Sequence, residues 1–123
     1  MKQFFGMSQR GDLKEAVRGL TNPQLILLMS NSNQFEEHVK ELEALYPQVP
    51  SIGCIGMSYK TSIVEHGVGI IAFSDGVAAV ANVLEHVSVM PVRYIDRLEK
   101  DVSAIGGSQK DTVCIDFCSA NDA

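Results

Sequence analysis

Apolar side chains that recur with a helical period mark three segments of the chain, at residues 11–20, 35–46 and 91–105. In each segment the apolar positions are three or four residues apart, which is the pattern of a helix with one apolar face. We therefore predict three helices that each pack one face on a core. The three faces consist of Leu13, Ala16, Val17 and Leu20; of Phe35, Val39, Leu42, Leu45 and Tyr46; and of Ile95, Leu98, Val102 and Ile105.

Residues at the helix ends support these assignments. Asp12 precedes Glu15 by three residues, and Asn33 precedes Glu36 by the same interval, which is the spacing of a capping box. The third segment starts with a proline and ends with two glycines, as helices often do. All three helices therefore have predicted starts or ends as well as apolar faces.

Two short apolar runs, residues 24–29 (QLILLM) and 51–57 (SIGCIGM), lie on either side of the second predicted helix. Both are bounded by turn residues, as expected of strands that are buried on both faces. Strands joined through a helix run parallel to one another in most sheets. Residues 24–57 therefore predict a right-handed βαβ unit.

A third apolar run, residues 67–73 (GVGIIAF), ends close to the dipeptide Asp75-Gly76, which suits a tight hairpin turn. Residues 77–83 are then predicted to be the returning strand. Their apolar positions also fit a helical stripe, and we favour the strand because the turn dipeptide lies between two apolar runs. Residues 112–117 (TVCIDF) predict a last strand. The fold class is thus α/β, with a mixed, partly parallel sheet that contains a βαβ unit and a hairpin and is flanked by about three helices.

Composition narrows the class of protein further. A chain of 123 residues, with 46% hydrophobic and 20% charged residues, fits a single globular domain over residues 1–123. The net charge of −5 disfavours a nucleic-acid partner, because phosphate binding uses clustered lysine and arginine. No window has the length and apolarity of a membrane span, and the first residues do not resemble a secretion signal. We therefore predict a cytoplasmic protein with neither nucleic-acid nor membrane partners.

The three cysteines, Cys54, Cys114 and Cys118, lie in apolar, strand-like runs and are predicted to be reduced, buried thiols. Two chemical alternatives remain open. Cys54 could act as a nucleophile with His66, or Cys114 and Cys118 could contribute to a metal site with an aspartate between them. Neither has the spacing of a known site, so no catalytic residue, metal or cofactor is expected.

The other two histidines are predicted to have no functional role. His38 lies on the edge of the second amphipathic helix. His86 lies in the run Leu-Glu-His-Val, shortly after the predicted returning strand at residues 77–83. Surface or core-margin placement is the simpler explanation of both.

The run SIGCIGMSYKTSIVEHGVGIIAFSDGVAAVANV resembles the N-terminal part of the FIST family of prokaryotic sensory domains. The likeness lies in a Gly-Cys strand end at Gly53 and Cys54, a turn of small residues, and apolar strands joined by Ser-Asp-Gly. The helices and strands predicted over residues 11–46 and 91–117 occur in the same order in that family. One difference is the turn after Cys54, which usually reads Ser-Thr-Gly-Gly or similar and is Ile-Gly-Met-Ser in this chain.

The resemblance implies a signal-input domain that binds small ligands such as amino acids and passes the signal to a downstream output domain. Family members continue well beyond 123 residues, so the rest of the same polypeptide is an expected partner. Ligands of open α/β sheets bind beyond the carboxyl ends of parallel strands. We therefore predict a ligand site with Gly53, Cys54, Ser58 and Tyr59 on one wall, and the opposite wall is predicted to contain Ser119 and Asn121.

Alternatives from other classes are a cysteine- or metal-dependent enzyme and a purely structural interaction module. The glycines around Cys54 would then serve close strand packing alone. The chain is not expected to be an enzyme. Because the sequence stops just after a predicted interior strand, we also expect the segment 1–123 to self-associate or to be marginally stable.

Overall fold

The computed structural model describes residues 1–56, 58–59, 62–63, 66–85, 89 and 91–118. The chain divides into two compact units, Met1–Ala79 (unit 1) and Val80–Ala123 (unit 2), and each is described by itself. The described residues of the two units form a four-stranded mixed sheet, a two-stranded sheet and three helices, so the predicted α/β class with a partly parallel sheet is confirmed. Within the described residues, no helix is both long enough and apolar enough to span a membrane.

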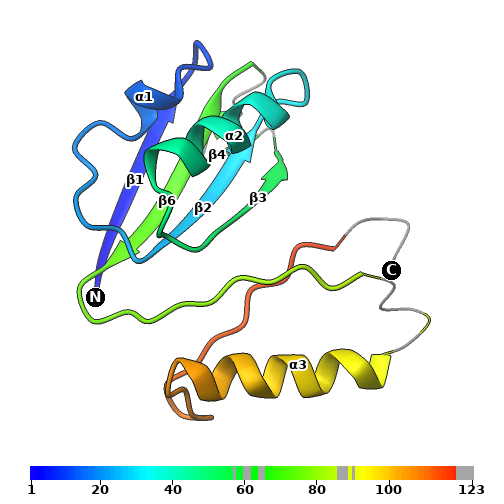
Figure 1. Cartoon of the computed structure of the whole chain (residues 1–123). Helices are drawn as coiled ribbons and strands as arrows, with labels where there is room; N and C mark the ends of the chain where they lie inside the picture. The colour runs from blue at the N-terminus through cyan, green and yellow to red at the C-terminus, as the bar shows by residue number, and fades with distance from the viewer. Residues whose placement is uncertain (57, 60–61, 64–65, 86–88, 90, 119–123) are drawn as a thin grey trace. The chain divides into compact units, whose positions relative to one another are not determined.

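The main sheet of unit 1 has the strand order β1-β6-β2-β3 (Figure 1). Its strands are β1 (Lys2–Ser8), β2 (Leu25–Ser30), β3 (Ser51–Ile55) and β6 (Val68–Ser74). β2 and β3 are parallel, and β6 runs antiparallel to both β1 and β2. It follows that β1, β2 and β3 all run in the same direction and end at the same edge of the sheet.

The βαβ prediction is confirmed, since β2 and β3 pair in parallel on either side of α2 (Phe35–Leu45). Its second strand ends at Ile55 rather than continuing to residue 57, which lies outside the described residues. Strand β1, by contrast, was not predicted. Its apolar residues Phe4, Phe5 and Met7 neither alternate regularly nor form one continuous run, and its place is set by antiparallel pairing with β6.

The core lies between one face of the sheet and the helices α1 (Leu13–Ala16) and α2, which cover that face in Figure 1. The register aligns Ile26 with Ala72 and Leu28 with Ile70, so that side chains from β2 and β6 project from the same face. Burying a side chain of this size contributes about 1.5–3 kcal/mol. The buried core residues are Leu13, Ala16, Ile26, Leu28, Leu42, Val68, Ile70 and Ala72.

Helix α1 is shorter than the predicted segment 11–20. Asp12 caps it as predicted, because its carboxylate accepts hydrogen bonds from the backbone N–H groups of Lys14 and Glu15. The reciprocal half of the capping box is wrong, since the Glu15 side chain bonds to Ser8 and Arg10 instead. The helix stops early because the chain turns through Gly19, whose φ of +87° favours glycine.

The predicted cap of α2 at Asn33 is also wrong. The helix begins after Gln34, which makes no side-chain capping bond. The Asn31 Oδ1 atom accepts the Gln34 backbone N–H at 3.0 Å, so an asparagine closer to the strand holds this turn. The side chain that caps a helix depends on the path of the preceding loop, which the spacing of Asn33 and Glu36 does not report.

The predicted hairpin after β6 is wrong, although its turn was correctly placed. Asp75 and Gly76 have positive φ angles of 58° and 79°, but residues 77–85 have no regular secondary structure. The reason lies in the sheet order, because β6 already pairs with β1 on one side and with β2 on the other. Neither edge of β6 is open to a returning strand.

A small antiparallel sheet follows β3 in the polar stretch that the sequence left without an element. It consists of β4 (Ser58–Tyr59) and β5 (Ser62–Ile63). Both strands have only two residues, which is too short for a pattern of alternating side chains to appear in the sequence.

In unit 2 the third helix is confirmed as α3 (Pro91–Ala104). It ends in the predicted glycine pair, where Gly106 has a φ of +69° and the Gly107 N–H donates to the Val102 carbonyl at 2.9 Å. The last predicted strand, residues 112–117, is wrong because residues 112–118 have no regular secondary structure. Consequently Cys114 and Cys118 are exposed rather than buried as predicted.

Candidate functional site

The carboxyl ends of β1, β2 and β3 bring several polar residues to one edge of the main sheet. Their last residues lie in one row, since Ser8 and Ser30 both align with Val68, and Ser30 also aligns with Ile55. We call this region the carboxyl edge, and it comprises residues 8–12, 30–34, 55–56 and 66–67. Helices α1 and α2 both begin there. All the buried polar residues of the described chain (Ser8, Ser30, Asn31 and His38) lie at this edge or on the first turn of α2 beside it.

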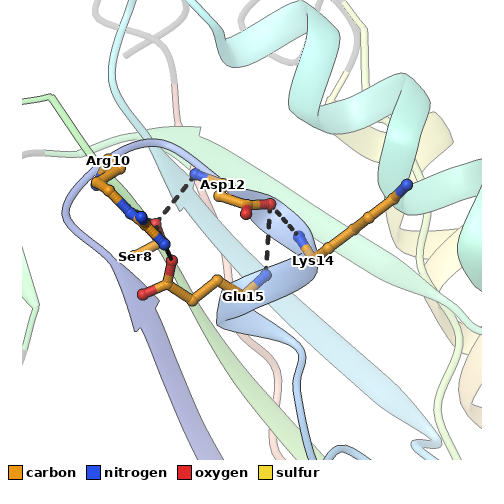
Figure 2. Close-up of polar contacts among 5 residues, drawn as sticks. All are labelled: Ser8, Arg10, Asp12, Lys14 and Glu15. Atoms are coloured by element: carbon orange, nitrogen blue, oxygen red, sulfur yellow. Dashed lines mark hydrogen bonds and ion pairs between the residues drawn. The ribbon is translucent and has the colours of Figure 1, made fainter.

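Ser8 holds the loop between β1 and α1 in place, as Figure 2 shows. Its hydroxyl oxygen accepts the backbone N–H groups of Arg10 at 3.3 Å and Asp12 at 3.1 Å, and its hydroxyl donates to Glu15 Oε2 at 3.5 Å. Ser8 itself is 1% exposed. A buried side chain thus takes the place of backbone partners for two loop amides.

On the outer side of the same loop, the Arg10 guanidinium forms an ion pair with the Glu15 carboxylate. The hydrogen bond to Glu15, followed by the charge of that carboxylate, raises the pKa of Arg10. The arginine is largely exposed. A cation of the carboxyl edge therefore lies beside a carboxylate in α1.

Asn31 connects the end of β2 to the segment that precedes β6. Its side-chain amide donates to the carbonyl oxygens of His66 and Gly67, each at 3.1 Å, and to Gln34 Oε1 at 3.0 Å. Its backbone N–H also donates to Gly67. Asn31 is 5% exposed, so one buried residue holds two loops of the edge together.

His38 is buried within this network, which corrects the prediction of a surface or core-margin position. It is 2% exposed, and its ring nitrogens lie 2.6 Å from Ser30 Oγ and 2.8 Å from the Gly11 carbonyl oxygen. A signal was present in the sequence, because His38 falls three residues after Phe35 and four before Leu42 on the apolar face of the helix. His86 lies outside the described residues.

The Ser30 and His38 pair does not have the access that a nucleophilic serine needs. A serine next to a histidine is typical of hydrolases, where the hydroxyl faces a substrate. Ser30 is 0% exposed, and both ring nitrogens of His38 already contact protein atoms. The pair therefore fits a structural role in the described residues.

The predicted ligand residues are only partly brought together. Gly53 and Cys54 lie within β3 opposite Leu28 and Met29, and a Cβ atom on Gly53 would lie 3.2 Å from Leu28 Cβ. Close packing against β2 thus accounts for Gly53. Cys54 is half-buried rather than buried as predicted, and two residues further on the Gly56 N–H donates to the Ser30 carbonyl oxygen at 3.0 Å.

The remaining predicted residues have less definite places. Ser58 and Tyr59 form β4, which begins two residues after Gly56 of the carboxyl edge. Ser119 and Asn121, the predicted opposite wall, lie outside the described residues. Ser8, Ser30 and Asn31 were not among the predicted site residues, although small polar residues directly at the ends of apolar runs are a usable signal of such an edge.

The alternative cysteine sites gain no geometric support. Within the described part of the chain, no group of three or more histidine, cysteine, aspartate or glutamate side chains is placed to hold a metal ion. The Cys114 thiol donates to Asp116 Oδ1 at 3.6 Å. Cys114 is exposed, but slight desolvation of its thiol, followed by the charge of Asp116 and the hydrogen bond to it, raises the pKa of Cys114, which opposes the formation of a reactive thiolate.

Unit 2 has an open groove along α3 where charges of both signs meet. Arg97 is held there by a hydrogen bond of 3.1 Å from its guanidinium to the Val83 carbonyl oxygen. The groove is lined by Val83, Glu85, Arg93, Tyr94, Asp96, Arg97 and Lys100. These side chains are mostly exposed, so the groove lacks the buried polar network of the carboxyl edge.

The chain was compared with known proteins at three levels. No family model matches it, and no match is found among curated proteins or solved structures. The carboxyl edge of the sheet is therefore the basis for a functional interpretation.

Proposed function

We propose that this chain is a small-ligand-binding signal-input domain of the FIST type, and that it acts in the cytoplasm by binding rather than by catalysis. The observation that carries the proposal is the convergence of three parallel strand ends with Ser8, Ser30 and Asn31 at one edge. Open α/β sheets bind ligands at such edges, and rigid supporting residues preserve the geometry of a binding site. The resemblance over residues 51–83 supports the same class.

The charges at the carboxyl edge favour an amino acid or a similar metabolite as the ligand. The Arg10 guanidinium of that edge forms an ion pair with the Glu15 carboxylate in α1. A free amino acid carries a carboxylate and an ammonium group, which would bind to the guanidinium and the carboxylate respectively. Gly53, Cys54, Ser58 and Tyr59 would adjoin these charges. The contribution of Ser119 and Asn121 stays a prediction, because both lie outside the described residues.

In this proposal the signal passes from the ligand to the rest of the same polypeptide and to a downstream output domain. Neither nucleic acid nor a membrane is a partner. Ligand binding would act by stabilising one arrangement of the loops at the carboxyl edge. A ligand shifts a conformational equilibrium only through its different affinity for the two states.

The test is thermal unfolding of the chain with each of the twenty amino acids and a panel of small metabolites. A ligand present at a hundred times its Kd stabilises the folded state by about 2.7 kcal/mol, which gives a clear shift in Tm. Binding by any positive compound is then measured by calorimetry. If no compound shifts the Tm, the proposal is contradicted.

A matched pair of variants locates the site. Arg10→Gln is expected to weaken binding of a positive compound at least about tenfold, because it removes a charged hydrogen-bond donor. Arg18→Gln makes the same change at an exposed position beyond the end of α1 and is expected to leave binding unchanged. Equal loss in both variants would indicate a general charge effect instead of a site at the carboxyl edge.

A further inference from the structure

His38 connects three segments of unit 1 that are separate in the sequence. The residue lies in the first turn of α2, Ser30 ends β2, and Gly11 belongs to the loop between β1 and α1. Its Nδ1 atom lies 2.6 Å from Ser30 Oγ, and its Nε2 atom lies 2.8 Å from the Gly11 carbonyl oxygen. One buried ring therefore contacts both the end of β2 and the loop between β1 and α1.

The chemistry of the two partners assigns the hydrogens. A carbonyl oxygen only accepts hydrogen bonds, so the Nε2 atom of His38 must carry the hydrogen that is donated to Gly11. The Ser30 hydroxyl has a single hydrogen and two acceptors in reach, His38 Nδ1 at 2.6 Å and the Asn31 carbonyl oxygen at 3.1 Å. In a ring whose hydrogen is on Nε2, Nδ1 is an acceptor, so the Ser30 hydroxyl donates to Nδ1.

The loop that His38 contacts has an unusual backbone. Gly11 has a φ of +74°, which side-chain-bearing residues rarely adopt, and a Cβ atom there would overlap Gln34 Oε1. The backbone N–H groups on either side of Gly11, those of Arg10 and Asp12, both donate to Ser8 Oγ. The His38 hydrogen bond thus fixes the carbonyl group of Gly11, the residue between Arg10 and Asp12 whose positive φ lets the loop turn back toward α1.

We propose that His38 is a positioning residue, which holds the Arg10–Asp12 loop in place at the carboxyl edge through the Gly11 carbonyl group. The role in ligand binding rests on the proposed function, whereas the role in ordering the loop does not. Nothing in the position of His38 suggests contact with a ligand, since it is 2% exposed. Its effect on binding is therefore exerted through the loop that carries Arg10.

Two conservative variants separate the two hydrogen bonds. In His38→Gln the side-chain amide nitrogen lies near the position of Nε2 and can still donate to Gly11. In His38→Asn the amide lies near the position of Nδ1, so the bond to Ser30 can be kept and the bond to Gly11 is lost. Ser30→Ala removes the other partner and leaves Gly11 bonded to the histidine.

Hydrogen exchange of the Arg10 and Asp12 amides measures loop order directly. We expect His38→Asn to raise their exchange rates at least about tenfold, because a buried hydrogen bond is lost, and we expect His38→Gln and Ser30→Ala to preserve most of the protection. Amides of the β2–β6 ladder serve as the internal control in each folded variant. Equal exchange in the Gln and Asn variants would overturn the proposal.

A spectroscopic measurement on the unmodified chain covers the case in which the Asn variant does not fold. The ¹⁵N chemical shifts of His38 should show a protonated Nε2 atom, and an unprotonated Nε2 atom would overturn the proposal. The twenty-amino-acid panel then completes the test: a positive compound should bind at least about tenfold more weakly to His38→Asn than to His38→Gln. If no amino acid binds the unmodified chain, the proposed function fails while the loop result stands by itself.

Discussion

The two units of the chain differ sharply in how they use apolar residues. Unit 1 contains every buried residue that the structure describes, whereas unit 2 has only exposed and half-buried positions among its described residues. Nine of the thirteen large apolar side chains recorded as exposed belong to unit 2. Residues 24–29 and 112–117 are both apolar runs, yet only the first forms a strand. An apolar run becomes a strand where neighbouring strands can pair with it.

The largest expected difference concerns the core. Ile70→Ala should destabilise unit 1 by about 3 kcal/mol, because Ile70 is 0% exposed on the central strand β6 and the change leaves a cavity. Ile95→Ala on α3 should change stability by less than about 0.5 kcal/mol, since Ile95 is 55% exposed. Urea unfolding followed by circular dichroism measures both. Similar losses in the two variants would mean that the α3 face is buried in solution.

A second comparison concerns two glycines. A Cβ atom on Gly6 would overlap the Ala16 carbonyl oxygen, so Gly6→Ala should force β1 and α1 apart and cost about 2 kcal/mol. A Cβ atom on Gly106 would have nothing within 4 Å, and Gly106→Ala should cost about 1 kcal/mol from its positive φ alone. Thermal unfolding of the two variants tests whether Gly6→Ala is the more destabilising change. The contact between α1 and β1 would be in question if Gly6→Ala were as stable as the parent chain.

Two serines make the same kind of turn in different surroundings. Ser8→Ala should cost about 1.5 kcal/mol, because it leaves the loop amides of Arg10 and Asp12 without a buried acceptor. Ser108 also accepts a backbone N–H, from Lys110, but it is exposed, and Ser108→Ala should cost less than about 0.5 kcal/mol. Denaturant midpoints of both variants give the comparison. A larger loss of stability in Ser108→Ala than in Ser8→Ala would contradict the expectation that unit 1 is the more sensitive of the two units.

The smallest expected effect is in thiol reactivity. Cys114 in unit 2 is exposed and Cys54 in unit 1 is half-buried, so a thiol reagent should modify Cys114 first in the folded chain. Because the raised pKa of Cys114 comes first from burial and then from Asp116, its labelling rate should rise with pH through and beyond the ordinary thiol range.

The control for that experiment is Asp116→Asn in a chain whose other two cysteines are serine. Removing the carboxylate should lower the pKa of Cys114 and speed labelling at pH 8 by less than about tenfold, since tenfold corresponds to one pKa unit. Slower labelling in that variant would contradict the assigned role of Asp116. Faster labelling of Cys54 than of Cys114 would contradict the difference between the units.

Several elements were predictable because their signals are local. The helix α3 and its glycine end, the cap of α1 at Asp12 and the turn at Asp75-Gly76 all depend on residues within a few positions of one another. The βαβ unit was predictable for a related reason, since two apolar runs around an amphipathic helix have few other arrangements. The predicted ligand site at the carboxyl ends of parallel strands stays a prediction, and it did not include the buried polar residues Ser8, Ser30 and Asn31.

Local sequence patterns limit which segments can be helix, strand or turn, because propensity and periodicity act over short distances. Which of these segments pair with one another depends on the packing of the whole chain. It placed β6 between β1 and β2, which left residues 77–83 without a strand partner, and it turned Glu15 toward Ser8 and Arg10. It also buried His38 against Gly11, a residue 27 positions away. Such contacts depend on the sheet order and on the path of the loops, which no local pattern specifies.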